Sequence, residues 1–316
     1  MGLGKNKILL AIDSSDYSFN SVRYVSQMMP PDQTEVVLFN VISRIPDGYL
    51  DMEAGTAYNA EHYRLRAWET LQEKLINDFV TKARSFFLER NFPEEAVRVK
   101  IVAKKAGVTR DILSESKDGY QAVVVGRRGL NPISELVLGS VSHKLIGAAS
   151  HVPVWVVGGV IRPDKVIVAL DTSAGAMKAV DHVAKLARGA DWRITLVHVI
   201  RDVDFAPPDL ALVNLEEWRR DFEKELRQIE KDMQPFFNQA VTILEQAGIN
   251  RNFLDTRVLT TGSSRAGAIV DYATEEAYGT IILGRRGLSK VQEFIMGRVS
   301  NKVVQLAKDL AIWVIN

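Results

Sequence analysis

The sequence predicts an α/β protein built from two tandem, doubly wound domains, each a five-stranded parallel sheet flanked by helices. Its 316 residues are many for one hydrophobic core and suit two domains of about 150 residues each. The sequence also repeats itself at a constant displacement, and each repeat alternates short apolar runs with longer periodic segments. We expect domains at 1–158 and 159–316, called half one and half two below.

The internal repeat is clearest around a glycine-arginine motif. Residues 123–130 read VVVGRRGL and residues 281–288 read IILGRRGL, so that Gly126 corresponds to Gly284, 158 residues further along. One displacement that holds over nearly the whole chain indicates a duplication. The same displacement relates Asp13 to Asp171, Val41 to Val199, Gly139 to Gly297, and Trp155 to Trp313.

Each half alternates strands and helices in the same order. An apolar run at 7–12 ends at Asp13-Ser14-Ser15, which are turn and N-cap residues for a helix over 18–28. A periodic segment without proline over 61–90 predicts a long helix. The other elements expected in half one are strands at 35–41, 97–103, 121–126 and 153–157 and helices at 109–116 and from 139; the strands of half two are 165–170, 193–199, 253–260, 280–284 and 310–315.

Composition excludes several classes of function. The 40 basic and 39 acidic residues give a net charge of +1, so no overall field favours nucleic acid or an anionic membrane. The absence of cysteine excludes disulfides, thiolate metal sites and cysteine nucleophiles, and the five histidines lack metal-pair spacing. No signal peptide or membrane span is readable, so we expect a cytoplasmic protein with neither a membrane nor a nucleic-acid partner.

The candidate site follows from the parallel sheet. Ligands bind beyond the carboxyl ends of such strands, where the strand order reverses. Asp13 follows the first strand and Val41 ends the second. After the fourth strand, glycines permit close approach and a helix start directs its amides at an anion, which predicts a phosphate cradle. The cradle sequence is Gly126-Arg127-Arg128-Gly129, nine residues, then Gly139-Ser140-Val141-Ser142.

This stretch is not a P-loop, because no Lys-Ser or Lys-Thr follows a glycine at the required spacing, and it is not the dinucleotide fingerprint either. With its Gly-x-x-Gly-x9-Gly-Ser pattern, the chain resembles the tandem, two-domain members of the universal stress protein family, over essentially its whole length. The resemblance implies a Rossmann-like fold of the adenine nucleotide alpha-hydrolase-like type. It also implies binding of ATP or AMP, with or without Mg²⁺.

The resemblance further assigns site residues by position. The Val41 backbone is expected to recognise the adenine edge, and Arg127 either reaches phosphate or lies in solvent. Half two departs from the family pattern at Arg298, where the family has Ser or Thr. The implied nucleotide-binding residues are Ala11, Ile12, Asp13, Val41, Gly126, Arg127, Gly129, Gly139, Ser140, Val141 and Ser142 in half one, and Ala169, Asp171, Val199, Gly284, Gly287, Gly297, Arg298, Val299 and Ser300 in half two.

Each feature also has a purely structural interpretation. Asp13 and Asp171 can serve as helix caps, and the glycines can serve only tight turns. The apolar terminal strands at 151–158 and 310–315 need cover. In the resembled family the equivalent strands pair across a dimer, so here the two halves are expected to pair as an internal pseudo-dimer, with a further homodimer left open.

Three functions remain as hypotheses. The leading one is a stress-response regulator that binds an adenine nucleotide and thereby changes its contacts with an unidentified protein partner. No general base or catalytic triad is readable, so we expect no catalytic residues and at most slow ATP hydrolysis. The alternative is a scaffold of the same fold that binds no nucleotide. A phosphate-accepting receiver ranks last, because Val102-Ala103-Lys104 stands where such a domain needs an aspartate.

Overall fold

The computed structural model describes residues 6–44, 56–129, 138–159, 162, 164–201, 215–287 and 296–316. The elements of half one follow the predicted order, and the long helix starts earlier than the pattern at 61–90 predicts. They are β1 (Asn6–Ala11), α1 (Asp16–Met28), η1 (Pro31–Gln33), β2 (Thr34–Ile42), α3 (Thr56–Leu88), η2 (Glu94–Ala96), β3 (Val97–Ala103), α4 (Val108–Glu115), β4 (Ala122–Gly126), α5 (Ser140–Ala148) and β5 (Val154–Val157).

Half two repeats this order, as the duplication predicts. Its described elements are β6 (Lys165–Ala169), α6 (Ala174–Leu186), β7 (Arg193–Arg201), α7 (Leu215–Gln246), η5 (Arg251–Phe253), β8 (Leu254–Thr261), α8 (Arg265–Glu275), β9 (Thr280–Gly284), α9 (Arg298–Leu306) and β10 (Ala311–Ile315).

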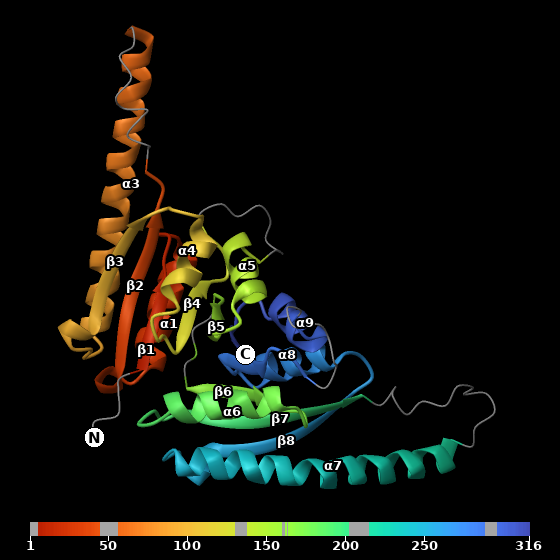
Figure 1. Cartoon of the computed structure of the whole chain (residues 1–316). Helices are drawn as coiled ribbons and strands as arrows, with labels where there is room; N and C mark the ends of the chain where they lie inside the picture. Colours follow the sequence, from red (N-terminus) through yellow and green to blue (C-terminus); the bar gives the residue numbers. More distant parts are fainter. Residues whose placement is uncertain are drawn as a thin grey trace.

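The strands of both halves form one ten-stranded sheet in the order β3-β2-β1-β4-β5-β10-β9-β6-β7-β8. Within each half the pairs are parallel, and the order reverses between β1 and β4 and between β6 and β9. Buried strands such as β4 carry apolar residues on both faces because helices cover both. The predicted class, two doubly wound α/β repeats, is therefore confirmed (Figure 1).

The two halves meet where β5 and β10 pair in antiparallel register, with Trp155 opposite Trp313. The two indole rings stack with centroids 3.7 Å apart and planes within 2°. Both side chains are fully buried. The terminal strands thus cover each other, which resolves the problem of two bare apolar edges.

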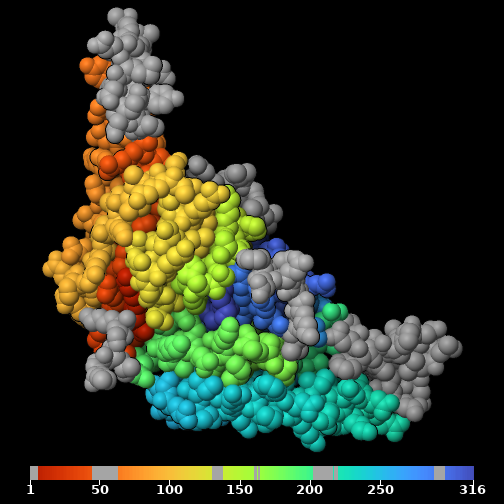
Figure 2. All heavy atoms as spheres, in the orientation of Figure 1, coloured from red at the N-terminus to blue at the C-terminus, as the bar shows by residue number. Residues whose placement is uncertain are grey.

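The helices enclose two hydrophobic layers, one on each face of the sheet, and each layer draws on both halves. Helices α3 and α7 extend beyond the packed body on different sides of the molecule (Figures 1 and 2). Within the described ranges, no helix combines the length and apolar character that crossing a bilayer requires.

Candidate functional site

The turn after β1 is built around the Asp13 carboxylate. Its Oδ1 accepts hydrogen bonds from the Ser15 amide (3.1 Å), the Ser15 hydroxyl (2.6 Å) and the Ser18 hydroxyl (2.6 Å). Ser15 itself caps α1. In half two, Asp171 likewise accepts from the amide of Ser173, which caps α6. The two aspartates therefore hold the cap residue in place rather than capping the helices themselves.

The loop after the fourth strand contacts this aspartate in each half. A Cβ atom placed on Gly129 would collide with Oδ2 of Asp13, and one on Gly287 would lie 2.5 Å from Oδ2 of Asp171. Residues 116 positions apart in the chain thus meet at the switch point, as predicted. Only glycine allows so close an approach of backbone to carboxylate.

In each half the loop also contacts the start of the helix that follows it. The Gly139 amide donates to the Arg127 carbonyl (2.8 Å), and the Gly297 amide donates to the Arg285 carbonyl (2.8 Å). Ser140 starts α5 and its side chain is exposed. The first-turn amides of α5 have no acceptor inside the helix, so they can bind an anion.

The hydroxyls of two predicted nucleotide-binding residues donate to the backbone in this structure. The Ser142 hydroxyl is buried and donates to the Gly126 carbonyl (2.7 Å), and the Ser300 hydroxyl donates to the Gly284 carbonyl (2.8 Å). A hydroxyl has one proton to donate. Both serines therefore fasten the helix to the end of the preceding strand, and the backbone amides remain as donors toward the cradle.

The backbone of Val41 faces the crevice between β1 and β4. The Ile12 amide donates to the Phe39 carbonyl (2.9 Å), whereas the Lys104 amide, on the other side, donates to the Ile42 carbonyl (2.8 Å). Carbonyls two residues apart along a strand point to the same side. The carbonyl of Val41 therefore points past the end of β1, into the crevice where a ligand edge would lie.

The residue before Val41 braces this corner, and sequence reasoning missed it. The Asn40 amide donates to the Ile12 carbonyl (2.8 Å), and in half two His198 Nδ1 lies 2.8 Å from the Leu170 carbonyl. A carbonyl can only accept, so Nδ1 carries the proton. Burial lowers the pKa of His198 and favours the neutral ring. Asn40 and His198 are both polar and lie 158 positions apart, and this correspondence is the signal that could have identified them.

Arg127, predicted to reach phosphate or solvent, does neither. Its side chain is 2% exposed. The guanidinium donates to carbonyls at the end of α9 in half two: Val304 (2.8 Å), Gln305 (3.0 Å) and Ala307 (3.2 Å). These carbonyls have no partner within the helix, and a cation at a helix C-terminus is favourable. The side chain thus joins the halves, whereas its backbone belongs to the cradle of half one.

Arg285 repeats this arrangement in the opposite direction. Its guanidinium donates to the carbonyls of Gly147 (2.5 Å) and Ala149 at the end of α5 and to the Asn316 side chain (3.1 Å). Helices α5 and α9 are therefore each held at the first turn by the loop of their own half and at the last turn by the arginine of the other half.

The remaining predicted residues lie as follows. The next arginine, Arg128, donates to the Tyr17 hydroxyl (3.2 Å) and lies over its ring. Arg298 and Val299 are exposed at the start of α9. Ala11 and Ile12 are buried at the end of β1, and Ala169 and Val141 are half-buried. The nine residues between Gly129 and Gly139 fall largely outside the described residues.

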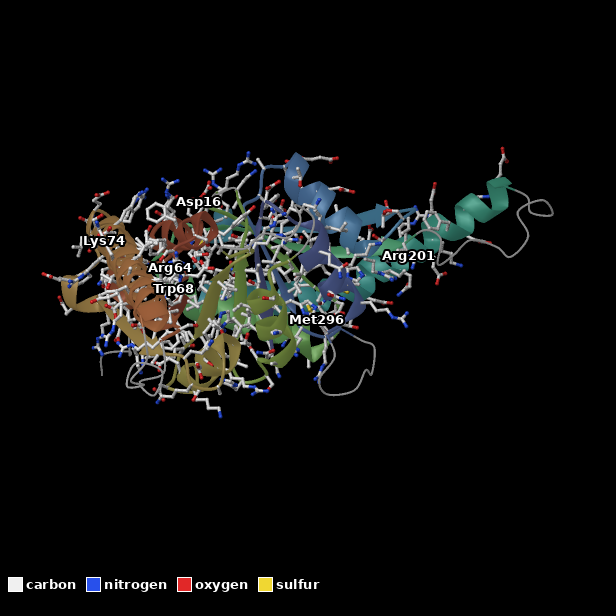
Figure 3. All side chains as sticks on the ribbon, turned by 90° about the horizontal axis from the view of Figure 1, so that it is seen from above. Asp16, Arg64, Trp68, Lys74, Arg201 and Met296 are labelled. Atoms are coloured by element: carbon white, nitrogen blue, oxygen red, sulfur yellow. The ribbon has the colours of Figure 1, made fainter. Side chains whose placement is uncertain are left out.

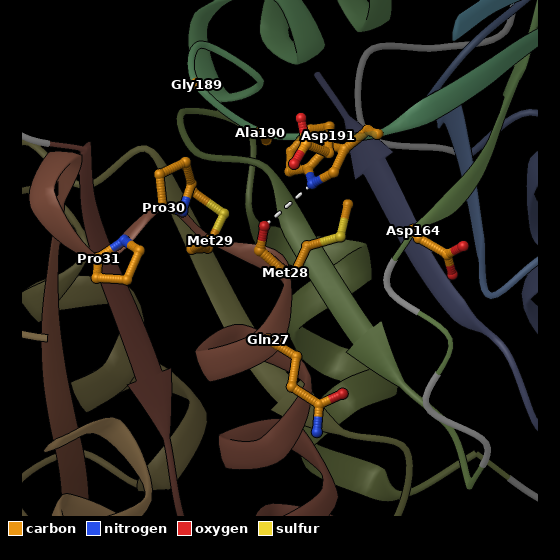
Figure 4. Close-up of a pocket in the computed structure, with 10 residues that line it drawn as sticks. Gln27, Met28, Met29, Pro30, Pro31, Asp164, Gly189, Ala190 and Asp191 are labelled. Carbon is orange, nitrogen blue, oxygen red and sulfur yellow. Dashed lines mark hydrogen bonds between the residues drawn. The ribbon is translucent and has the colours of Figure 1, made fainter. Parts of the chain in front are cut away.

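A pocket of about 250 Å³ lies elsewhere, at the junction of the halves (Figure 4). The Trp192 indole N–H crosses this junction and donates to the Met28 carbonyl (3.0 Å). The pocket adjoins η1, at the amino ends of the strands, whereas α/β sites lie at the carboxyl ends. The pocket therefore lies apart from the glycine loops. The pocket is lined by Gln27, Met28, Met29, Pro30, Pro31, Asp164, Gly189, Ala190, Asp191 and Trp192.

Comparison with known proteins gives one family for both halves. The family model described as "Universal stress protein family" matches residues 5–158 and again 163–309. The universal stress protein YxiE of Bacillus subtilis is 28% identical over 156 residues, covering 48% of this chain and 98% of the relative. A universal stress protein of Mycolicibacterium smegmatis is 27% identical over 208 residues, covering 64% of this chain and 66% of the relative.

Solved structures match the whole chain in fold. A universal stress protein from Archaeoglobus fulgidus aligns with a TM-score of 0.60 and 19% identity, over 99% of both chains. The Pseudomonas aeruginosa protein PA1789, described as functionally unknown, aligns with a TM-score of 0.55 and 13% identity, over 98% of this chain and 92% of its own. At these identities the likeness concerns the fold.

Proposed function

This chain belongs to the universal stress protein family, and we propose that it binds an adenine nucleotide, ATP or AMP, in half one and acts as a stress-response regulator through nucleotide-dependent contacts with a protein partner. One observation carries the proposal. The contact between Gly129 and Asp13 brings the loop to the carboxyl end of β1, and the Val41 carbonyl points past the end of the same strand.

The chemistry of these groups suits a nucleotide. The first-turn amides of α5 offer donors to a phosphate. The Val41 carbonyl offers an acceptor to the amino group at the adenine edge, which is a hydrogen-bond donor. A Cβ atom on Gly129 would collide with Oδ2 of Asp13, so the glycine allows the loop to lie against this carboxylate.

We expect at most slow ATP hydrolysis. The three hydrogen bonds from Ser15 and Ser18 engage Oδ1 of the Asp13 carboxylate in the turn before α1. Within the described ranges, no three His, Cys, Asp or Glu side chains are grouped as a metal site. Whether Mg²⁺ accompanies the nucleotide is part of the test below.

The proposal is tested by calorimetric titration of nucleotide-stripped protein with ATP, ADP and AMP, with and without Mg²⁺. We expect about one equivalent to bind. Gly129→Glu should abolish binding, because it fills the cradle and adds a second negative charge beside Asp13. The matched control is Gly147→Glu, since a Cβ at this exposed position on α5 meets no atom within 4 Å.

A scaffold without nucleotide is the second candidate, and one observation favours it. Helix α3 exposes large apolar side chains, and one of them, Trp68, is labelled in Figure 3. Exposed apolar patches of this kind are typical of protein contacts. If no nucleotide binds under any condition, this function replaces the first. The exposed side chains are Tyr63, Leu65, Trp68, Leu71 and Leu75.

A further inference from the structure

Half two has the same crevice as half one, with the same acceptor. The Leu170 amide donates to the Val197 carbonyl (2.8 Å), so the carbonyl of Val199, two residues on, points past the end of β6. It corresponds to the Val41 carbonyl of half one. On geometry alone, both halves could therefore present an acceptor to the amino group of adenine.

In half two a side chain already uses this acceptor. Arg265 is the first residue of α8, and its Nε donates to the Val199 carbonyl at 3.3 Å. The guanidinium also lies near enough to His198 for its charge to contribute to the lowered pKa of that imidazole, after the larger effect of burial. Arg265 is half-buried, so the contact lies inside the crevice rather than on the open surface.

The matching helix start in half one carries no such group. Helix α4 begins at Val108, after the cap residue Gly107, and a valine side chain has no hydrogen-bond donor. The residue before the valine differs as well: it is Asn40 in half one and His198 in half two. The two halves thus share a backbone and differ in charge at the end of the crevice that faces the base.

We infer that Arg265 closes half two to adenine by occupying the carbonyl that half one offers to the base. This inference rests on the proposed function. A nucleotide that entered half two would have to displace a charge-assisted hydrogen bond, which weakens its binding by roughly tenfold or more. Arg298, which departs from the family pattern, is exposed at the start of α9 and is not the residue that excludes the base.

The test compares the wild type with Arg265→Val, which gives α8 the first residue of α4. Titration with ATP and AMP should give about one equivalent for the wild type and two for the variant. Photolabelling with 8-azido-ATP, followed by peptide mapping, should mark only half one in the wild type and both halves in the variant. If Arg265→Val does not fold, Arg265→Met keeps the aliphatic stem and serves the same measurement.

Two controls separate the effect of Arg265 from a general loss of positive charge. Arg110→Val removes an exposed arginine near the start of α4, and Arg298→Ser restores the family residue in half two. Both should keep one equivalent and the labelling pattern of the wild type.

The outcomes separate this inference from the proposed function. A wild type that binds no nucleotide contradicts both. A wild type that binds two equivalents, or is labelled in both halves, supports the proposed function and overturns the role of Arg265. The same role is overturned if Arg265→Val and Arg265→Met stay at one equivalent, or if Arg298→Ser alone opens half two.

Discussion

The two halves place different polar groups around the same tryptophan pair. On one side, the Trp313 indole N–H donates to the Tyr24 hydroxyl (2.9 Å), which also hydrogen-bonds to Thr280 (2.7 Å). On the other side, His182 stands at the position of Tyr24 and meets Trp155 edge-on. Within the described residues, neither the Trp155 N–H nor His182 Nε2 has a hydrogen-bond partner.

The difference between Tyr24 and His182 shows that the two halves of a duplicated chain can diverge at an equivalent position. In a symmetric dimer, one residue at each position must satisfy both copies of an interface. Here each half meets one fixed partner, so Tyr24 and His182 have separate surroundings and can diverge. The crevices follow the same logic, with Val108 in half one and Arg265 in half two. A shared fold therefore does not imply two equal sites.

The largest loss of stability is expected on replacing Arg127 or Arg285, the arginine that each half uses to contact the other. Arg127→Met and Arg285→Met should each lower the free energy of unfolding by about 3 kcal/mol, because each leaves buried helix-terminal carbonyls without donors. Urea denaturation measures this. Arg128→Met, which removes only the contact with Tyr17, should cost about 0.5 kcal/mol. Equal losses for Arg127 and Arg128 would contradict the linking role.

The free energy of unfolding should fall at acid pH because of His182, the buried histidine of half two. Burial, with a smaller effect of the Lys185 charge, lowers the pKa of His182 to about 3, below its usual 6.5. The unfolded chain therefore binds the proton first, so stability is lost as the pH falls from about 6.5 toward 3. At pH 5 the loss from this group is about 2 kcal/mol.

The measurement is the urea stability of His182→Phe against the wild type at pH 7 and pH 5. The variant should lose about 2 kcal/mol less than the wild type over this interval. The exposed His143 provides the control, since His143→Gln should follow the wild type. An unchanged pH dependence in His182→Phe would show that the acid sensitivity arises elsewhere.

A smaller difference in stability is expected between variants of the two stacked tryptophans. Trp313→Phe removes a hydrogen bond to Tyr24, whereas Trp155→Phe removes an indole N–H that has no partner among the described residues. Each variant replaces one of the two stacked indole rings. Trp313→Phe should therefore be less stable than Trp155→Phe by about 1 kcal/mol, measured by urea denaturation. The reverse order would mean that His182 accepts from Trp155 in solution.

The sequence predicted the backbone of this molecule well because its signals are local or repeated. Apolar runs such as 123–125 gave the buried strands, and the fixed displacement related the two halves. The bare apolar strands at the two chain ends also predicted that something must pair with them. In the structure these two strands, β5 and β10, pair with each other.

The roles of individual polar side chains in the candidate site were harder to predict. Arg127 looked like a phosphate or surface residue because its partners lie 177 to 180 positions away, on a helix of the other half. Ser142 matched the family pattern, yet a hydroxyl beside the strand end is drawn to the Gly126 carbonyl. Arg265 lay outside the motif altogether, and only packing brought it to Val199.

The pairing of β5 with β10 has a consequence for concentration. Two separate subunits that met through such strands would come apart on dilution, and their pairing would depend on how much protein is present. In this chain the strands belong to one molecule, so their effective concentration is set by the chain itself. The junction therefore persists at any protein level, and every molecule carries one copy of each half in a fixed ratio.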